Sequence, residues 1–173
     1  MVQDHVRPTR ARAHHAADLV RLRDSCARWQ RRRGIEQWAP GEVAPEQVRS
    51  QIERGEWWLV QDGAPVAAVR VLEEDPQVWP DPGPVPAYYV HGLMVDRGAT
   101  GRGLGERLLA WVEHTATDAG RGLVRLDCVS AGQGLRAYYE RLGYRPRGEV
   151  TFPAHLGWHP VTRYEKTLTW AGG

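Results

Sequence analysis

The sequence is poor in several features that mark particular classes of protein. It has only two cysteines, Cys26 and Cys128, far apart and without the Cys-x-x-Cys or Cys/His spacing of a metal site. We therefore expect two packed thiols, no disulfide framework and no metal. No apolar run is long enough to cross a membrane, and no secretory signal pattern opens the chain. These absences predict a cytoplasmic protein that does not associate with membranes.

Excess charge of one sign is also missing. The formal net charge is only +2, and no block of like charge is longer than three residues, as in Arg31–Arg33. These arginines end a helical pattern, where cations complement the helix dipole, so nucleic-acid binding is not expected. The length of 173 residues and a hydrophobic content of 42% suit one core. We expect a single domain over residues 1–173.

Apolar periodicity and glycine or proline boundaries predict an alternation of strands and helices. The expected strands are 5–11, 57–61, 66–72, 87–95, 123–129, 144–150 and 161–168, and the expected helices are 14–33, 45–55, 103–120 and 135–142. Asp62-Gly63 predicts a hairpin between two antiparallel strands. The proline-rich stretch 76–86 predicts an extended surface loop beside the active site.

The most informative pattern is a glycine-dense turn between the strand that ends at Val95 and an amphipathic helix. Gly101, Gly103 and Gly105 permit backbone conformations and close approaches that let N–H groups at the helix start face an anion. The turn lacks the lysine of a P-loop. Its position in the middle of the chain does not suit a dinucleotide-binding fingerprint either. A phosphate ligand of another kind is therefore indicated.

Two stretches resemble the GNAT superfamily of acyl-CoA-dependent N-acetyltransferases. Residues 100–105, Thr-Gly-Arg-Gly-Leu-Gly, resemble its motif A, except that Thr100 replaces the usual Gln or Arg. Residues 135–144, Leu-Arg-Ala-Tyr-Tyr-Glu-Arg-Leu-Gly-Tyr, resemble its fourth-helix signature, with Gly132 upstream where asparagine is frequent. The resemblance implies an α/β fold: a mixed, mostly antiparallel sheet of six or seven strands, with helices on both faces and a split near strand 87–95.

The resemblance also implies acetyl-CoA as co-substrate. Its pyrophosphate would lie on the backbone N–H groups of residues 101–106, with added charge from Arg102, and its pantetheine arm would pair with residues 93–95. The residues expected to bind the cofactor are Leu93, Met94, Val95, Thr100, Gly101, Arg102, Gly103, Leu104, Gly105 and Glu106.

The catalytic roles follow from the same resemblance. Tyr139 would lie at the coenzyme sulfur as proton donor, and the Leu93 N–H would polarise the thioester oxygen. His91 occupies the position of a base-relay histidine in the serotonin N-acetyltransferase branch, although a structural histidine or a water relay remains an alternative. Tyr89 matches a glutamate base of the histone-acetylating branch, but with a reference pKa of about 10 it cannot readily act as that base. Cys128 shows no sign of an activated thiolate, so we expect direct transfer in a ternary complex.

The acceptor is expected between the loop after the first helix and the last hairpin. Glu36, Trp38, Tyr89 and Trp158 are the candidate substrate-binding residues, with Phe152 and His159 nearby. We expect the acceptor to be a small-molecule primary amine, and a homodimer is an oligomeric state open to the protein. A protein amine, a larger acyl donor and a non-catalytic acyl-CoA-binding regulator remain alternatives.

Overall fold

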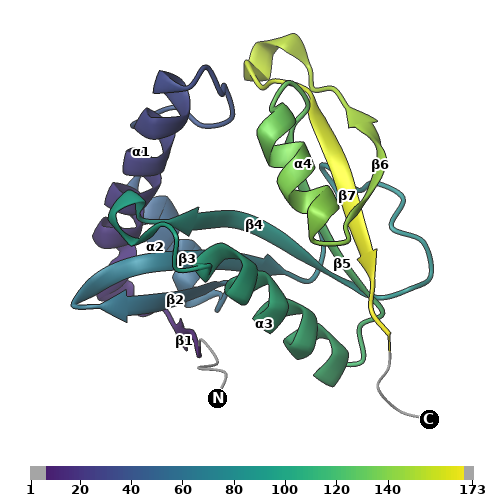
Figure 1. The fold of residues 1–173 in the computed structure, drawn as a ribbon, viewed down its shortest axis with the longest axis horizontal. Coiled ribbons are helices and arrows are strands. Elements are labelled where there is room, and N and C mark those ends of the chain that lie inside the picture. Colours follow the sequence, from purple (N-terminus) through teal and green to yellow (C-terminus); the bar gives the residue numbers. More distant parts are fainter. Residues whose placement is uncertain (1–6, 170–173) are drawn as a thin grey trace.

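The computed structural model describes residues 7–169, which form one twisted sheet flanked by helices (Figure 1). The helices are α1 (Ala16–Arg32), α2 (Pro45–Glu53), α3 (Leu104–Asp118) and α4 (Gln133–Arg141). The strands are β1 (Thr9–Arg10), β2 (Trp57–Asp62), β3 (Ala64–Leu72), β4 (Ala87–Val95), β5 (Leu123–Val129), β6 (Arg145–Val150) and β7 (Val161–Thr167).

The seven strands lie in the order β1-β2-β3-β4-β5-β7-β6, and only the pair β4 and β5 is parallel. That parallel pairing is short, because it joins Ala87–Tyr89 to Leu123–Arg125 and then ends. Beyond these residues β4 and β5 diverge, as Figure 1 shows. The expected mixed, mostly antiparallel sheet with a split near strand 87–95 is confirmed.

The helices cover both faces of the sheet, as expected for an α/β fold. On one face, α1 and α2 bury Leu19 and Ile52 in a core shared with Leu59 of β2. On the other face, α3 buries Leu108 and Val112 in the larger core, together with residues of β3, β4, β5 and α4. The sheet therefore holds α1 on one side and the glycine turn before α3 on the other, at the end where β4 leaves β5.

Most predicted elements form close to their expected bounds, including the hairpin at Asp62-Gly63 and the irregular stretch 76–86. The first strand is a correction. Only Thr9–Arg10 pair with β2, and the chain turns into a short 3₁₀ helix at Ala13–His15; residues 5 and 6 lie outside the described part. The imidazole of His15 closes this turn by accepting a hydrogen bond from the Arg12 N–H at 2.9 Å, which ends the strand early.

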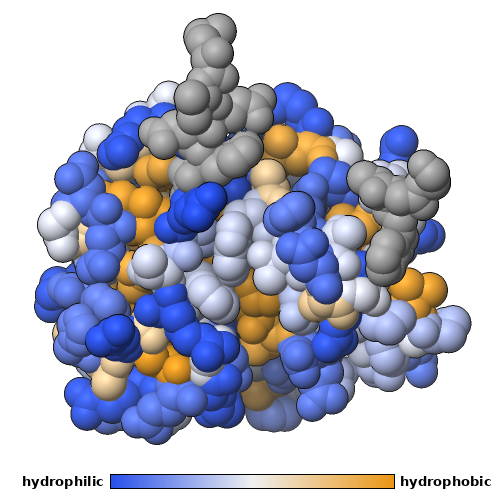
Figure 2. Space-filling model, turned by 90° about the horizontal axis from the view of Figure 1, so that it is seen from below, coloured by the Kyte–Doolittle hydropathy of each residue, from blue (hydrophilic) through white to orange (hydrophobic). Residues whose placement is uncertain are grey.

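The surface seen from below in Figure 2 is mostly hydrophilic, and its hydrophobic areas are separate patches. Large apolar side chains are rarely exposed: within residues 7–169, Val85 and Trp158 are the ones exposed by more than two fifths. No helix in the described part of the chain combines the length and apolarity needed to cross a membrane.

Candidate active site

Two cavities meet at the split between β4 and β5. The larger, of about 950 Å³, lies between the loop after α1, the loop before β4 and the end of β5. The smaller, of about 520 Å³, lies between α1, the end of β4 and the start of α3. Both are lined by Trp38, Leu93 and Tyr139. A ligand in one cavity can therefore meet a ligand in the other beside these three residues.

The glycine turn forms one wall of the smaller cavity. Gly101 and Gly103 have φ values of +81° and +64°, which favour glycine, and Gly103 is the residue before the first turn of α3. Gly105 is needed for space, since a Cβ there would lie 2.8 Å from the Tyr138 hydroxyl. The first N–H groups of α3 have no partner within their own helix, so this wall suits an anion.

The predicted cofactor residues all line this smaller cavity, with one exception. Arg102 is exposed and does not line it; its guanidinium lies 3.9 Å from the Asp62 carboxylate in the hairpin turn between β2 and β3. The expectation that Arg102 adds charge to the cradle is therefore corrected. Arg97, which the sequence reasoning missed, does line the cavity and stacks 3.8 Å over the Trp29 ring.

Gln30 of α1 also lines the smaller cavity and was missed. Its side chain is 6% exposed, and its amide oxygen has no hydrogen-bond partner among the described residues. A buried amide without a partner carries a free-energy cost, which a ligand with amide N–H groups can remove. No local motif identifies Gln30, because α1 reaches the cavity only through the tertiary fold.

Tyr139 lies on α4 at the boundary between the two cavities. Its ring packs against Tyr138, Tyr144 and Tyr164, which fixes its position. Burial raises the pKa of Tyr139 far above its ordinary value, so the hydroxyl remains protonated at any physiological pH. The side chain can therefore donate a proton at the junction of the cavities.

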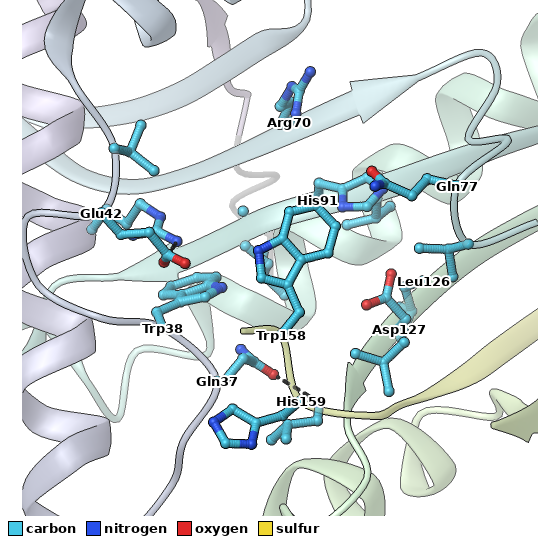
Figure 3. A pocket seen from close by; sticks show the side chains of 18 of the residues that line it. Gln37, Trp38, Glu42, Arg70, Gln77, His91, Leu126, Asp127, Trp158 and His159 are labelled. Atoms are coloured by element: carbon cyan, nitrogen blue, oxygen red, sulfur yellow. Dashed lines mark hydrogen bonds and ion pairs between the residues drawn. The ribbon is translucent and has the colours of Figure 1, made fainter. Parts of the chain in front are cut away.

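The larger cavity contains most of the residues predicted for the acceptor. Glu36, Trp38 and Trp158 line it, as do Phe152 and His159, and Figure 3 shows Trp38, Trp158 and His159 around the opening. The proline-rich stretch also lines the larger cavity, through Pro76, Gln77 and Val78. This agrees with its predicted place beside the active site.

Tyr89 was also predicted to bind the acceptor, and this prediction is wrong for the larger cavity. The structure places it away from the cavity wall, 3% exposed, with its hydroxyl accepting a hydrogen bond from Arg125 at 3.0 Å and its ring beside Trp79. The parallel pairing with β5 still holds β4 at Tyr89, so this side chain faces a closed part of the sheet.

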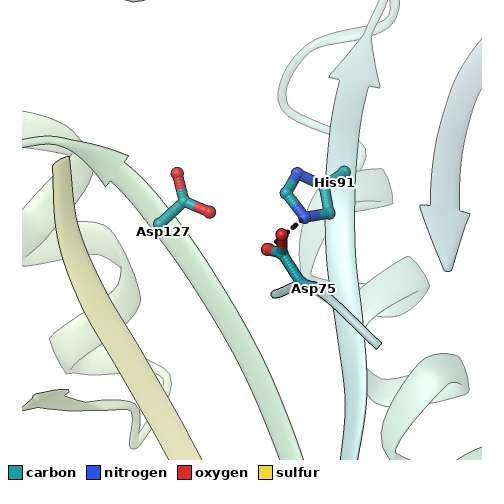
Figure 4. Close-up of side chains that lie close together, drawn as sticks. All are labelled: Asp75, His91 and Asp127. Atoms are coloured by element: carbon teal, nitrogen blue, oxygen red, sulfur yellow. Dashed lines mark hydrogen bonds and ion pairs between the residues drawn. The ribbon is translucent and has the colours of Figure 1, made fainter. Parts of the chain in front are cut away.

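His91, Asp75 and Asp127 form a cluster in the larger cavity (Figure 4). His91 Nε2 and Asp75 Oδ2 are 2.8 Å apart, and one ligand atom of each of the three residues lies within 4.8 Å of the others. The two aspartates come from the loop after β3 and from β5, and neither was predicted. Only the geometry of the split brings them to His91.

The charges in this cluster shift one another's pKa values. Burial lowers the pKa of His91, but the hydrogen bond to Asp75 and the negative charge of Asp127 outweigh it, so the pKa ends above its ordinary value. Burial raises the pKa of Asp127 to about 6; the charge of Asp75 adds to this rise and His91 opposes it. The cluster therefore exchanges protons near neutral pH.

The same three residues are of types that ligate divalent ions. The Nε2 atom of His91 is, however, already engaged by Asp75. The expectation of no metal stays a prediction. Cys128 lies next to Asp127, and burial raises its pKa to about 12, so it is a protonated thiol and not a nucleophilic thiolate.

Known proteins share both the sequence pattern and the fold. Residues 22–144 match the acetyltransferase (GNAT) family. A relative described as the uncharacterized N-acetyltransferase YesJ of Bacillus subtilis (strain 168) is 32% identical over 162 residues, which cover 89% of this chain and 86% of the relative.

Solved structures agree in fold. An acetyltransferase of the GNAT family from Listeria monocytogenes 4b F2365 superposes with a TM-score of 0.75 at 24% identity, over 94% of each chain. The polyamine N-acetyltransferase of Drosophila melanogaster has a TM-score of 0.64 at 18% identity, over 94% of this chain and 99% of its own. The chain therefore belongs to the acetyltransferase (GNAT) family of acyl-CoA-dependent N-acetyltransferases.

Proposed function

We propose that this enzyme transfers the acetyl group of acetyl-CoA directly to a primary amine of a small molecule. The observation that carries the proposal is the contact between two cavities at Trp38, Leu93 and Tyr139. One cavity has the glycine turn and the free strand edge that suit coenzyme A, and the other has carboxylates and aromatic rings that suit an amine.

The donor is bound mainly by backbone groups. The N–H groups of residues 101–106 hold the pyrophosphate at the positive end of the α3 dipole, and Arg97 adds charge. The pantetheine arm lies along Leu93, Met94 and Val95, on the edge of β4 that β5 leaves unpaired. Gln30 offers its amide oxygen to an N–H group of the arm.

The chemistry is a single displacement. The acceptor nitrogen loses a proton to His91 and attacks the thioester carbon, while the Leu93 N–H stabilises the negative charge on the carbonyl oxygen. The carbon–sulfur bond then breaks, and the Tyr139 hydroxyl donates its proton to the departing thiolate. The second proton that the nitrogen loses as the amide forms restores the Tyr139 hydroxyl. Close alignment at the cavity junction supplies much of the rate enhancement.

The acceptor cavity favours a cation over an anion. Of its three arginines, Arg23 and Arg70 are paired with glutamates and Arg31 is exposed to solvent, whereas Asp75 and Asp127 share a single imidazole, that of His91. A fold relative, the polyamine N-acetyltransferase of Drosophila, is described as forming N-acetylagmatine. That relative's acceptor is a small cationic amine, which supports the same class here.

Release of free thiol from acetyl-CoA, measured with a panel of small amines and a lysine-containing peptide, tests the proposal. We expect release with small amines and initial velocities that intersect when both substrates are varied, because both must be bound together. Release only with the peptide would contradict the acceptor class. Parallel velocity lines would instead indicate an acyl-enzyme and contradict direct transfer.

A further inference from the structure

Asp127 is a half-buried carboxylate in the acceptor cavity without a partner. Its oxygens form no hydrogen bond or ion pair within residues 7–169, whereas Asp75 in the same cluster is bound to His91 at 2.8 Å. Figure 4 shows the Asp127 carboxylate projecting from β5 across the gap toward the other two residues. A partly desolvated charge of this kind is stabilised by a cation.

The other partly buried charges that line the cavity are already compensated. Arg23 contacts Glu42 at 2.8 Å, and Arg70 contacts Glu56, outside the cavity, at 2.7 Å. The cluster of Asp75, His91 and Asp127 carries a net charge of −1 when the imidazole is protonated and −2 when it is neutral, as its role as base requires, so it attracts a cation in both states.

The cross-strand neighbour of Asp127 on β7 is a cation, Arg163. Its guanidinium is directed elsewhere: Nη2 donates to the Arg147 carbonyl at 2.9 Å, and the group lies 5.0 Å from the Trp79 ring centroid. The sheet therefore presents Asp127 to the cavity without supplying a cation.

The position of Asp127 relates it to the reacting centre. It lines the same cavity as Leu93 and Tyr139, two of the three residues that also border the coenzyme groove. An ammonium group at Asp127 lies inside the space that opens toward the thioester. A carboxylate or phosphate attached beside that ammonium would be repelled by Asp127 and Asp75 together.

We propose that Asp127 binds the ammonium group of the acceptor directly, and that the acceptors are small aliphatic amines without an anionic group beside the amine. This inference rests on the proposed function, because it defines the acceptor of that same reaction. It excludes α-amino acids as good substrates.

A matched pair of amines tests the inference. Propylamine and 2-aminobutanoate have the same three-carbon amine, and the second adds a carboxylate on the carbon that bears nitrogen. We expect wild-type kcat/KM, measured by thiol release, to be at least about tenfold higher for propylamine. Equal values, or a preference for 2-aminobutanoate, would overturn the inference while leaving acetyl transfer to small amines intact.

Asp127→Asn keeps the shape and removes the charge. We expect kcat/KM for propylamine to fall about tenfold or more, mainly through KM, and the discrimination against 2-aminobutanoate to shrink. Asp127→Glu keeps the charge and should retain part of the affinity. Asp118→Asn is the control, because it removes the same charge from an exposed site on α3 outside both cavities. An unchanged KM in Asp127→Asn would overturn the inference.

Calorimetric titration of propylamine into the coenzyme A complex separates this inference from the proposed function. If the wild type binds propylamine without acetylating it and Asp127→Asn does not bind it, Asp127 binds the ammonium group but the proposed reaction is wrong. If both proteins bind propylamine equally, Asp127 does not bind the ammonium group, whether or not turnover occurs. Acetyl-CoA binding to each variant shows that the fold is intact.

Discussion

Tyr139 is the side chain whose chemistry the account depends on most, because it borders both cavities. Tyr139→Phe removes the hydroxyl and keeps the ring that packs against Tyr144 and Tyr164. We expect kcat to fall about 100-fold with little change in coenzyme A affinity, because the thiolate then leaves without a proton donor.

The control is Tyr138→Phe, which changes the neighbouring tyrosine on α4. Tyr138 lines the coenzyme groove but not the acceptor cavity, so kcat should stay close to that of the wild type. Thiol release gives kcat, and calorimetry gives the affinity for coenzyme A. An unchanged kcat in Tyr139→Phe would rule out this residue as the acid.

If His91 is the base, kcat/KM should depend on pH. A base acts only when deprotonated, and the pKa of His91 lies above its ordinary value of 6.5, so kcat/KM should fall as the pH drops through that raised pKa. In His91→Ala the acidic limb should lose the contribution of the imidazole, so its midpoint should shift. The group that can still titrate is Asp127, whose pKa of about 6 is no longer lowered by His91 in this variant.

The matched control for His91 is His114→Ala, since His114 is an exposed histidine on α3 that lies 3.4 Å from Asp118. Its pH–rate profile should coincide with that of the wild type. If the acidic limb of His91→Ala keeps its midpoint, the base lies elsewhere.

The residues of the site differ in how far the sequence predicts them. The proposed cofactor residues lie in two short segments, 93–95 and 100–106, so a local pattern predicts them. Of these, Arg102 does not line the smaller cavity, because its side chain lies near Asp62. Asp75 and Asp127 were not predictable, because one lies in a loop and the other on β5. Each becomes part of a site only where β4 and β5 separate.

At the scale of elements, the glycine before α3 can be tested by substitution. Gly103 precedes the helix in a left-handed conformation with φ of +64°, which costs a residue with a Cβ about 1–2 kcal/mol. Gly103→Ala should therefore lower the free energy of unfolding by about that amount and weaken coenzyme A binding, because the N–H groups of the cradle shift. Thermal unfolding and calorimetry measure the two effects.

The control for Gly103 is Gly134→Ala in α4. Gly134 has no positive φ, and a Cβ there would meet nothing within 4 Å, so alanine should leave coenzyme A affinity close to the wild-type value and should not lower the free energy of unfolding. Coenzyme A affinity that is unchanged in Gly103→Ala would contradict the assignment of the cradle.

Helices and strands were predictable where glycine or proline marks their ends. Pro45 opens α2, Gly143 follows the end of α4, and Asp62-Gly63 makes the hairpin between β2 and β3. The expected strand 5–11 reaches Ala11, but the observed strand ends at Arg10, because a hydrogen bond from the Arg12 N–H to His15 redirects the chain. The split between β4 and β5 depends on strand register, which composition does not reveal; the family resemblance implied it.

At the scale of the whole molecule, the site needs distant parts of the chain. Gln30 comes from α1, Leu93 from β4 and Tyr139 from α4, and all three line the smaller cavity. We therefore propose that residues 1–173 act as a single domain. The oligomeric state stays a prediction; on the face in Figure 2 the hydrophobic areas are separate rather than continuous.

The central claim is that acetyl-CoA fills the smaller cavity with its sulfur at the junction of the two cavities. A crystal structure of the coenzyme A complex tests this most directly. We expect pyrophosphate oxygens within hydrogen-bonding distance of backbone N–H groups of residues 101–106, and the sulfur beside the Tyr139 hydroxyl. Coenzyme A bound outside this groove, or with its sulfur directed away from the cavity that contains His91 and Asp127, would contradict this claim.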